Sequence, residues 1–435
     1  VTGIEKKLIL SADSTRMKPN DAVGAYIQVQ LADGAGGTVD MIGATYSFES
    51  LNPEIITVNE AGHVLPIAIG ESEILVTVTL NGETYTDTIR FKVSNGKSAA
   101  TYYTPERVAA LRQNAKTYSW ARGGMDDCIT LADKYLAVGS DLSSYITTQE
   151  LPRGIVVGYR YDPDMYYCRY CNVNLAKKYG LYSWIINVPD EPWKVKCPDC
   201  RRVFPSNDFG KFYELGIDEH GNWRYELAKE KNAQLVANGQ DGYLKNVLYP
   251  EKGEGWGVDD GYGYRTGKTI LGTNGREQEE THTYIAYYNH WGIWNGISAK
   301  KLDDGFVTEA ITTLREAYLY TGEKKYGRAG AVLVDRVADV YPDMWTGAFF
   351  PNFFNSDSTQ PYGKMVGNIW QYGISQELMK AYDAFYDMYD DPQVIQIISE
   401  RAETWGLKEK HDAIAIRQHI EDDLLRENIR ALKSA

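Results

Sequence analysis

Four of the five cysteines form two CxxC pairs, a spacing that is typical of metal sites. The pairs are Cys168 with Cys171 and Cys197 with Cys200, and twenty-five residues separate them. Two such pairs supply four thiolates to one tetrahedral ion, and Zn²⁺ is the ion that this pattern predicts. Four protein sulfurs leave no open position for a substrate, so the predicted zinc is structural. The alternative is two disulfides, but a CxxC disulfide closes a short ring and is usually a redox device.

The stretch around these cysteines, residues 152–225, is predicted to be a zinc ribbon in which aromatic residues flank each pair. A ribbon of this size has little core of its own, so the metal and the aromatic side chains share its stabilisation. The fifth cysteine, Cys128, lies in a helical stretch and is predicted to be a buried thiol.

Aromatic residues also supply candidate sugar-binding positions, since the chain has 33 Tyr and 10 Trp. Their flat apolar faces and polar tips suit contact with sugars. The six candidates lie in a donor-rich segment, 280–294, and in a later helix: His282, Trp291, Trp294, Trp370, Gln371 and Tyr372. The alternative for each is packing in the core, and for segment 280–294 a packed aromatic helix is the favoured interpretation.

Composition describes a globular protein of about three domains. The chain has 435 residues, of which 43% are hydrophobic and 24% charged, and no apolar run approaches the ~18 residues that span a bilayer. The net charge of −13 argues against a general nucleic-acid binder, which would show a basic surface. The chain starts at Val1 without a signal peptide, which we interpret as a mature or trimmed secreted chain.

Residues 1–96 are predicted to form a β-sandwich. Short alternating runs separated by Gly, Asn and Asp indicate strands, and Asn81-Gly82 between two runs predicts a hairpin. Residues 50–58, 61–64 and 69–74 resemble the bacterial Ig-like group 2 domain. The resemblance implies a spacer or adhesive module of an exported bacterial protein, without chemistry of its own.

The rest of the chain is predicted to be mainly helical. Thr104 is the expected cap of a helix that begins at Pro105, and Gly322 is expected to end another. Helices are predicted near 126–136, 310–320, 325–340, 374–388 and 392–405 and from about 411, and 227–277 is predicted to be long loops. Acidic pairs at 259–260, 303–304 and 390–391 are interpreted as solvated turns, with a glycosidase carboxylate pair as the alternative.

The order of several helical motifs points to a family. Residues 316–326, 340–343, 367–371 and 380–383 follow one another as in the α/α toroid of heparinase II/III-type polysaccharide lyases, which they resemble. Residues 197–210 resemble an insertion found in some bacterial members. The implied fold is an N-terminal Ig-like β-sandwich followed by an incomplete all-α toroid over 97–435, with the zinc ribbon inserted at 152–225.

The resemblance implies β-elimination on a uronic-acid polysaccharide, glycosaminoglycan-like or alginate-like. A base removes the C5 proton, an acid protonates the leaving oxygen, and hydrogen-bond donors neutralise the carboxylate. The family order places the catalytic residues after Ala435, in a chain that we expect to be cut short. Inside the chain, Asn289 and His290 match the family's neutralising amide and histidine and are the fallback candidates. The family needs no nucleotide or flavin and implies a secreted or cell-surface location.

Two other functions compete with the lyase. One is a glycoside hydrolase on an α/α toroid, and the other is a non-catalytic secreted glycan-binding protein. The partner expected in each case is a polysaccharide, with no nucleic acid and no membrane span, and the sequence leaves the oligomeric state open. Because the chain is acidic overall, the lyase interpretation predicts a locally basic cleft for its acidic substrate.

Overall fold

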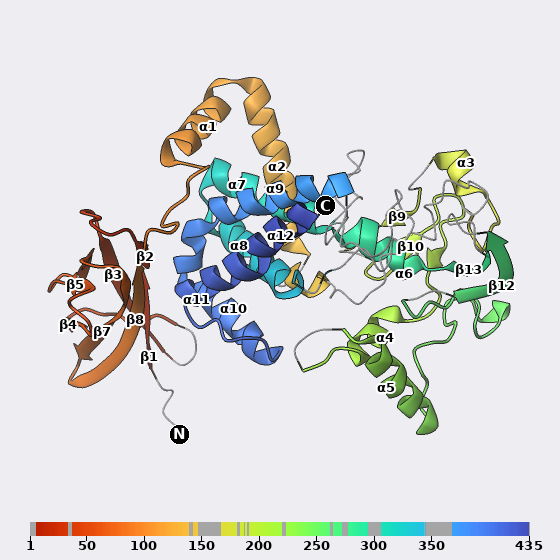
Figure 1. The fold of residues 1–435 in the computed structure, drawn as a ribbon, viewed down its shortest axis with the longest axis horizontal. Coiled ribbons are helices and arrows are strands. Elements are labelled where there is room, and N and C mark those ends of the chain that lie inside the picture. Colours follow the sequence, from red (N-terminus) through yellow and green to blue (C-terminus); the bar gives the residue numbers. More distant parts are fainter. Residues whose placement is uncertain are drawn as a thin grey trace.

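The computed structural model describes thirteen stretches of the chain. They are residues 6–33, 37–138, 142–146, 167–180, 183–186, 188, 191–219, 223–261, 264–271, 277–294, 306–342, 344 and 368–434. Figure 1 shows a β-rich part, a helical part and a mixed part that carries the two CxxC pairs, arranged in this order along the longest axis.

The N-terminal part consists of two four-stranded sheets that enclose one core. The sheet orders are β1-β3-β6-β5 and β2-β8-β7-β4. The strands are β1 Lys7–Ala12, β2 Arg16–Met17, β3 Ala25–Ala32, β4 Thr45–Ser50, β5 Ile56–Val58, β6 His63–Pro66, β7 Gly70–Leu80 and β8 Glu83–Val93. Inward-facing residues of both sheets, including Leu31, Val76 and Phe91, are fully buried in that core. A β-sandwich is therefore confirmed for this part.

The predicted hairpin at Asn81-Gly82 is confirmed. It joins β7 to β8, which pair antiparallel from Leu80↔Glu83 to Gly70↔Val93. Asn81 has φ 52° and Gly82 has φ 83°. Both central residues of a type I′ turn need positive φ, and Asn-Gly is the sequence that meets this need most readily.

The helical part begins after a short linker. Thr104 caps α1 (Pro105–Thr117) by accepting a hydrogen bond from the Arg107 amide, as predicted. The other helices of this part are α2 Ser119–Ala137, η1 Leu142–Tyr145, α7 Phe306–Thr321, α8 Lys324–Val340, α9 Asn368–Ala384, η6 Tyr386–Asp390, α10 Pro392–Thr404, α11 Ala413–His419, η7 Ile420–Arg426 and α12 Glu427–Ser434. Gly322 ends α7 with φ +75°, a conformation that favours glycine, and α8 packs back on α7.

In its described residues, the mixed part holds four α-helices, one 3-10 helix, a π-helical turn and two small sheets. They are α3 Leu175–Tyr179, β9 Ile185–Ile186, β10 Val195–Lys196, β11 Val203–Phe204, α4 Phe209–Leu215, α5 Tyr225–Ala237, η3 Pro250–Lys252, β12 Tyr264–Leu271, β13 Glu277–His282, α6 Tyr284–Tyr287 and η4 Tyr288–Trp294. The prediction of long loops over 227–277 is wrong for α5, β12 and β13. The apolar period is weak in α5, which buries Ala228 and Asn232, and β13 is polar, so its pairing with β12 depends on backbone hydrogen bonds.

The prediction of solvated acidic turns is wrong for two of the three pairs. Asp259 is buried and accepts the backbone N–H groups of Tyr284 and Ile285, so it caps α6. Asp390 and Asp391 are buried and paired with arginines. The pair 303–304 lies outside the described residues.

Ion pairs and hydrogen bonds, some of them buried, join the β-sandwich to the helices. Arg417 of α11 donates to Asp390, and Asp390 also accepts from the Thr15 backbone N–H (3.1 Å) and hydroxyl (2.6 Å). Arg16 of β2 pairs with Glu421 of η7 at 2.6 Å, and a bidentate pair links Arg90 of β8 to Asp412. Asp390 is withdrawn from water and depends on Arg417 and Thr15, whereas the side chains of Glu421 and Asp412 are 21% and 22% exposed.

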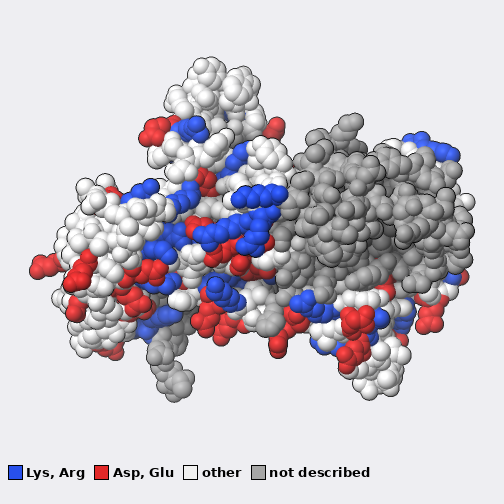
Figure 2. Space-filling view, in the orientation of Figure 1, with Lys and Arg blue, Asp and Glu red and all other residues white. Residues whose placement is uncertain are grey.

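Charge on the visible surface is mixed, although the chain is acidic overall. Figure 2 shows Lys and Arg in a band over α9 and α12, with acidic side chains beside them. Within that region Lys380 pairs with Glu377, Arg426 with Asp422 and Arg430 with Glu427. Of the helices that the structure describes, none is both long and apolar enough to cross a bilayer.

Replacement of Asp390 by Ala tests the boundary between the two parts. Arg417 would keep its charge in a fully buried position without its partner, so we expect the free energy of unfolding to fall by about 3–5 kcal/mol in urea titrations. The control is Glu226→Ala in α5, which removes an exposed ion pair with Lys229 and is expected to change stability by less than about 1 kcal/mol. An equal loss of unfolding free energy in the two variants would contradict the assignment of Asp390 as the buried partner of Arg417.

Candidate metal centre

The two CxxC pairs lie in loops with the same backbone hydrogen bonds. The first cysteine of each pair donates its N–H to the residue five positions later: Cys168 to Val173 at 3.0 Å and Cys197 to Arg202 at 2.9 Å. The carbonyl of the same cysteine accepts from the residue four positions later, Asn172 or Arg201, at 2.8 and 3.0 Å. Asn172 and Arg201 have φ of 57° and 62°. The chain therefore makes the same turn twice around one point.

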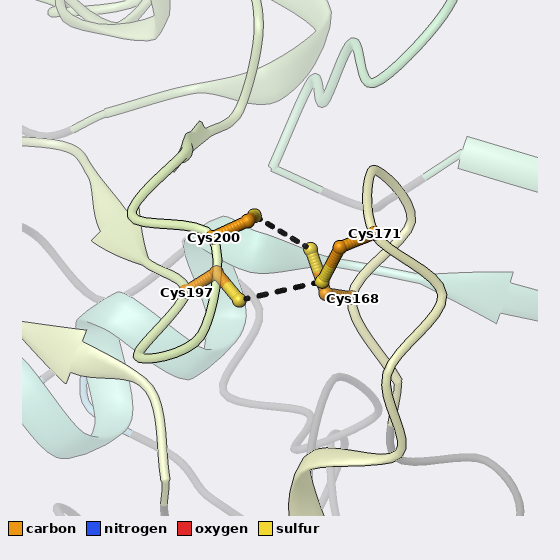
Figure 3. Close-up of side chains that lie close together, drawn as sticks. All are labelled: Cys168, Cys171, Cys197 and Cys200. Carbon is orange, nitrogen blue, oxygen red and sulfur yellow. Dashed lines mark hydrogen bonds between the residues drawn. The ribbon is translucent and has the colours of Figure 1, made fainter.

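The four sulfurs face one another across these loops (Figure 3). Cys168 Sγ lies 3.7 Å from Cys200 Sγ, Cys171 Sγ lies 3.9 Å from Cys197 Sγ, and all four lie within 4.8 Å of one another. A tetrahedral ion with Zn–S bonds of about 2.3 Å needs S···S edges of about 3.8 Å. A disulfide needs about 2.05 Å, and all four cysteines are free. The structure thus confirms a four-cysteine cluster that can hold a metal ion.

Contacts among the thiols of the cluster shift the pKa values of Cys197 and Cys168 in opposite directions. A hydrogen bond from Cys168 lowers the pKa of Cys197 to about 5, burial opposes this, and the backbone N–H groups of Cys200 and Asp199 lower it further. The same hydrogen bond, together with burial, raises the pKa of Cys168. Thiolates are the metal-binding form, so binding of a cation would displace the protons of those cysteines that are still thiols.

The sheet that carries the second cysteine pair is part of the main core. Trp184, just before β9, and Phe204 of β11 pack on Tyr284 of α6, with ring centroids 5.7 and 4.7 Å apart. One continuous apolar cluster runs from Cys168 and Cys197 to buried residues of α7, α8 and α9. The ribbon therefore has more core than the sequence suggests, because the core belongs to the helices as well.

Segment 280–294 supplies much of this shared core. Asn289 lies in the π-helical turn η4 and is fully buried, and Trp291 is 9% exposed. Tyr284, Tyr287 and Tyr288 are each 1% exposed. These burials agree with a packed aromatic helix, the favoured interpretation, and a polymer could reach Asn289 only after its neighbours had moved. The side chains of His282, His290 and Trp294 lie outside the described part of the structure.

The other predicted sugar-binding residues lie at the start of α9. Tyr372 is 58% exposed, and its hydroxyl accepts a hydrogen bond from Gln376. Trp370 and Gln371 belong to the same helix, but their side chains lie outside the described residues. Helix α9 and η4 both contact α7, so the two groups of candidates lie on elements that share one neighbour.

Cys128 is half-buried and outside the cluster. Its thiol donates to the carbonyl of Thr313 at 3.4 Å, and burial raises its pKa to about 12. It was predicted to be a buried thiol; it faces α7 and packs against the main core, but its side chain stays partly exposed. Cys128 is therefore a control cysteine for experiments on the four cysteines of the cluster.

A second buried cluster was missed by the sequence analysis. Lys410 donates to Asp335 at 2.6 Å and to Asp339 at 2.7 Å. The Nε2 atom of His419 lies 3.0 Å from Asp339, and its Nδ1 atom lies 2.9 Å from Asp423. The carboxylates and the histidine are close enough for a metal, but the Lys410 ammonium already supplies their cation. Asp335 and Asp339 are four apart on α8, a spacing that could have indicated a shared helix face.

A pocket of about 400 Å³ opens at the linker between the two parts. Its polar lining residues are paired with one another or with near neighbours: Asp383 accepts from Lys97 and from the backbone N–H groups of Thr101 and Tyr102, and Tyr382 donates to Glu421. Since these contacts fix the linker, we assign the pocket to the domain boundary.

Comparisons with known proteins give little guidance. No family model matches the chain, and no curated protein matches it. A crystal structure of an EHEC O157:H7 intimin mutant matches with 18% sequence identity and a TM-score of 0.14, covering 27% of this chain and 73% of that chain. The resemblances to Ig-like domains and to heparinase II/III-type lyases therefore stay predictions.

Single cysteine substitutions test the metal centre. Cys197→Ser removes one of four converging sulfurs, so we expect the bound metal, measured by elemental analysis, to fall from about one per chain to well below one. Cys128→Ser changes a cysteine outside the cluster and should keep the full metal content. If both variants keep the metal, or the unmodified protein binds none, the four sulfurs do not form a metal site.

The pH dependence of stability tests the second cluster. Burial by itself lowers the pKa of His419, but contacts with Asp339 and Asp423 and the nearby Asp335 charge outweigh burial and raise it to about 9. The histidine therefore stabilises the fold fully below its ordinary pKa of 6.5, and this contribution is lost as pH rises through about 9. In urea titrations, we expect His419→Gln to lack this alkaline loss. If the stability of the variant depends on pH as that of the unmodified protein does, His419 is not the group responsible for the alkaline loss.

Proposed function

We propose that the four cysteines bind one structural Zn²⁺ ion. The support is the donor set and its geometry, since four thiolates with S···S edges near 3.8 Å suit tetrahedral zinc. The ion would close both loops and would leave no site for a substrate, so its role is to hold the ribbon against the helices.

For the whole chain, the proposed activity is that of a polysaccharide lyase of heparinase II/III type, acting on a uronic-acid polysaccharide by β-elimination. The observation that carries this proposal is the order of the helical motifs. The hairpin of α7 and α8 around Gly322, the turn after Val340 and the motif at 380–383 in α9 occur in the succession that the family resemblance implies. A toroid of paired helices, with an Ig-like domain before it, is the proposed fold.

The second candidate is a non-catalytic secreted glycan-binding protein. The burial of Asn289 favours this alternative, because a catalytic amide must reach the uronate carboxylate. A hydrolase on the same helical scaffold would use two carboxylates about 5–10 Å apart on either side of the bond. Asp259 and Asp390 do not serve this role, since one caps α6 and the other binds Arg417.

The proposed lyase is tested by the chemistry of its products. We expect ultraviolet-absorbing unsaturated uronates when the protein is incubated with heparin, chondroitin sulfate, hyaluronan or alginate, and none with dextran, which has no uronate. The measurement is absorbance followed together with new reducing ends. Reducing ends without absorbance would identify a hydrolase, and neither signal despite binding would identify a glycan-binding protein.

Two substitutions ask whether segment 280–294 takes part. His290→Gln and Asn289→Asp each remove one candidate group with little change in size. If Asn289 and His290 perform the elimination, we expect each variant to form product at least a hundredfold more slowly than the unmodified protein. The unfolding midpoint of each variant should stay close to that of the unmodified protein. Undiminished product formation in both variants would exclude the pair.

A further inference from the structure

Two cations lie over the ring of one tyrosine inside the first CxxC pair. The Arg202 guanidinium is 4.8 Å and the Lys252 ammonium 5.2 Å from the centroid of Tyr170. Tyr170 belongs to the loop of the first pair, Arg202 follows the second pair by two residues, and Lys252 ends η3. Three separate segments thus bring their side chains to one place beside the cysteine cluster.

Aromatic side chains extend this place into a larger surface. The rings of Tyr249 and Trp256 lie 5.4 and 6.0 Å from that of Tyr170, and the Arg169 guanidinium lies 5.4 Å from the Trp256 ring. Tyr170 and Trp256 are partly exposed, and Arg202 and Lys252 are exposed. We call these residues the Tyr170 surface: Arg169, Tyr170, Arg202, Tyr249, Lys252 and Trp256.

The two exposed cations of this surface have no acidic partner in the described part of the chain. No ion pair or side-chain hydrogen bond involves Arg202 or Lys252 there, and the same holds for the neighbouring Arg201. The nearby chain contributes two exposed carboxylates, Glu251 and Glu254, which pair with neither of them. By contrast, Lys380 of α9, Arg426 of η7 and Arg430 of α12 each pair with a carboxylate three or four positions earlier.

Stabilisation of the ribbon does not explain this arrangement well. One cation over an exposed ring contributes about 0.5–1 kcal/mol. The two cations lie 4.8 and 5.2 Å from one centroid, so they are at most about 10 Å apart, and at a separation of about one Debye length or less they repel each other. An anion placed between or beside them would remove that repulsion and would use the bidentate fork of arginine.

We infer that the Tyr170 surface binds the acidic sugar chain, an inference that rests on the proposed function and gives its substrate a binding surface. Carboxylate or sulfate groups pair with Arg202 and Lys252, and a sugar ring packs on the exposed parts of Tyr170 and Trp256. The surface supplies the basic, aromatic site that an acidic chain of net charge −13 needs in order to bind a polyanion.

This surface depends on the cysteine cluster. Tyr170 lies between Cys168 and Cys171, and Arg202 accepts the Cys197 N–H through its carbonyl. Loss of a bound metal would release both loops. Binding of the sugar chain is therefore coupled to metal occupancy, although the sugar chain itself does not touch the metal.

Heparin binding tests the inference with a charge-matched comparison. The test variant is Arg202→Gln with Lys252→Gln. The control is Arg107→Gln with Lys229→Gln, which also removes two cations that lie over tyrosine rings, at 5.1 and 4.8 Å, but in α1 and α5. We expect heparin to bind the test variant at least tenfold more weakly, with a shallower salt dependence, and the control variant unchanged. Both should keep the metal content of the unmodified protein.

Three results would overturn the inference. They are equal heparin affinity in the test and control variants, heparin affinity that survives removal of the metal by a chelator, and tighter binding of single-stranded DNA than of heparin.

Failure of the lyase proposal is a separate result. If no uronate polymer gives ultraviolet-absorbing products but heparin binding is lost in the test variant, the surface stands and the lyase fails, whereas products with undiminished binding would reject the surface alone.

Discussion

The structure depends on the convergence of four sulfurs from two loops that are twenty-five residues apart. Identical turns around Cys168 and Cys197 aim both pairs at one point, and the S···S distances of 3.7 and 3.9 Å suit a tetrahedral ion. The consequences extend beyond the ribbon. Fixing the second loop fixes β10 and β11, which place Phe204 on Tyr284, and Asp259 caps the helix that carries Tyr284. The cysteine cluster is therefore one end of the core that includes α7 and α8.

Where the helices meet the linker and the β-sandwich, the contacts are made by charged and polar side chains, several of them buried. Asp383 in α9 accepts five hydrogen bonds from the linker residues Lys97, Thr101, Tyr102 and Tyr103, and Tyr382 donates to Glu421, the glutamate that pairs with Arg16. Both residues belong to the motif at 380–383 on which the resemblance to lyases partly depends. Their contacts give that motif a structural role in docking the β-sandwich, whether or not a sugar binds nearby.

Features decided by a few neighbouring residues could be predicted from the sequence. The Asn81-Gly82 hairpin, the Thr104 cap, the Gly322 helix end and the CxxC turns each follow from local backbone chemistry. Features decided by distant partners could not. Asp390 looks like a turn residue until Thr15, 375 positions away, and Arg417 are seen to enclose it, and Asp335 needs Lys410, 75 positions later. The side chains around Tyr170 come from three segments, so their spacing in the sequence gives no signal.

X-ray absorption at the zinc edge of the intact protein reports which atoms surround the metal and at what distance. If the four cysteines bind zinc, we expect one zinc per chain with a single shell of four sulfurs at about 2.3 Å. A shell containing nitrogen or oxygen ligands, or a protein without zinc in which Cys168, Cys171, Cys197 and Cys200 are joined as disulfides, would contradict it.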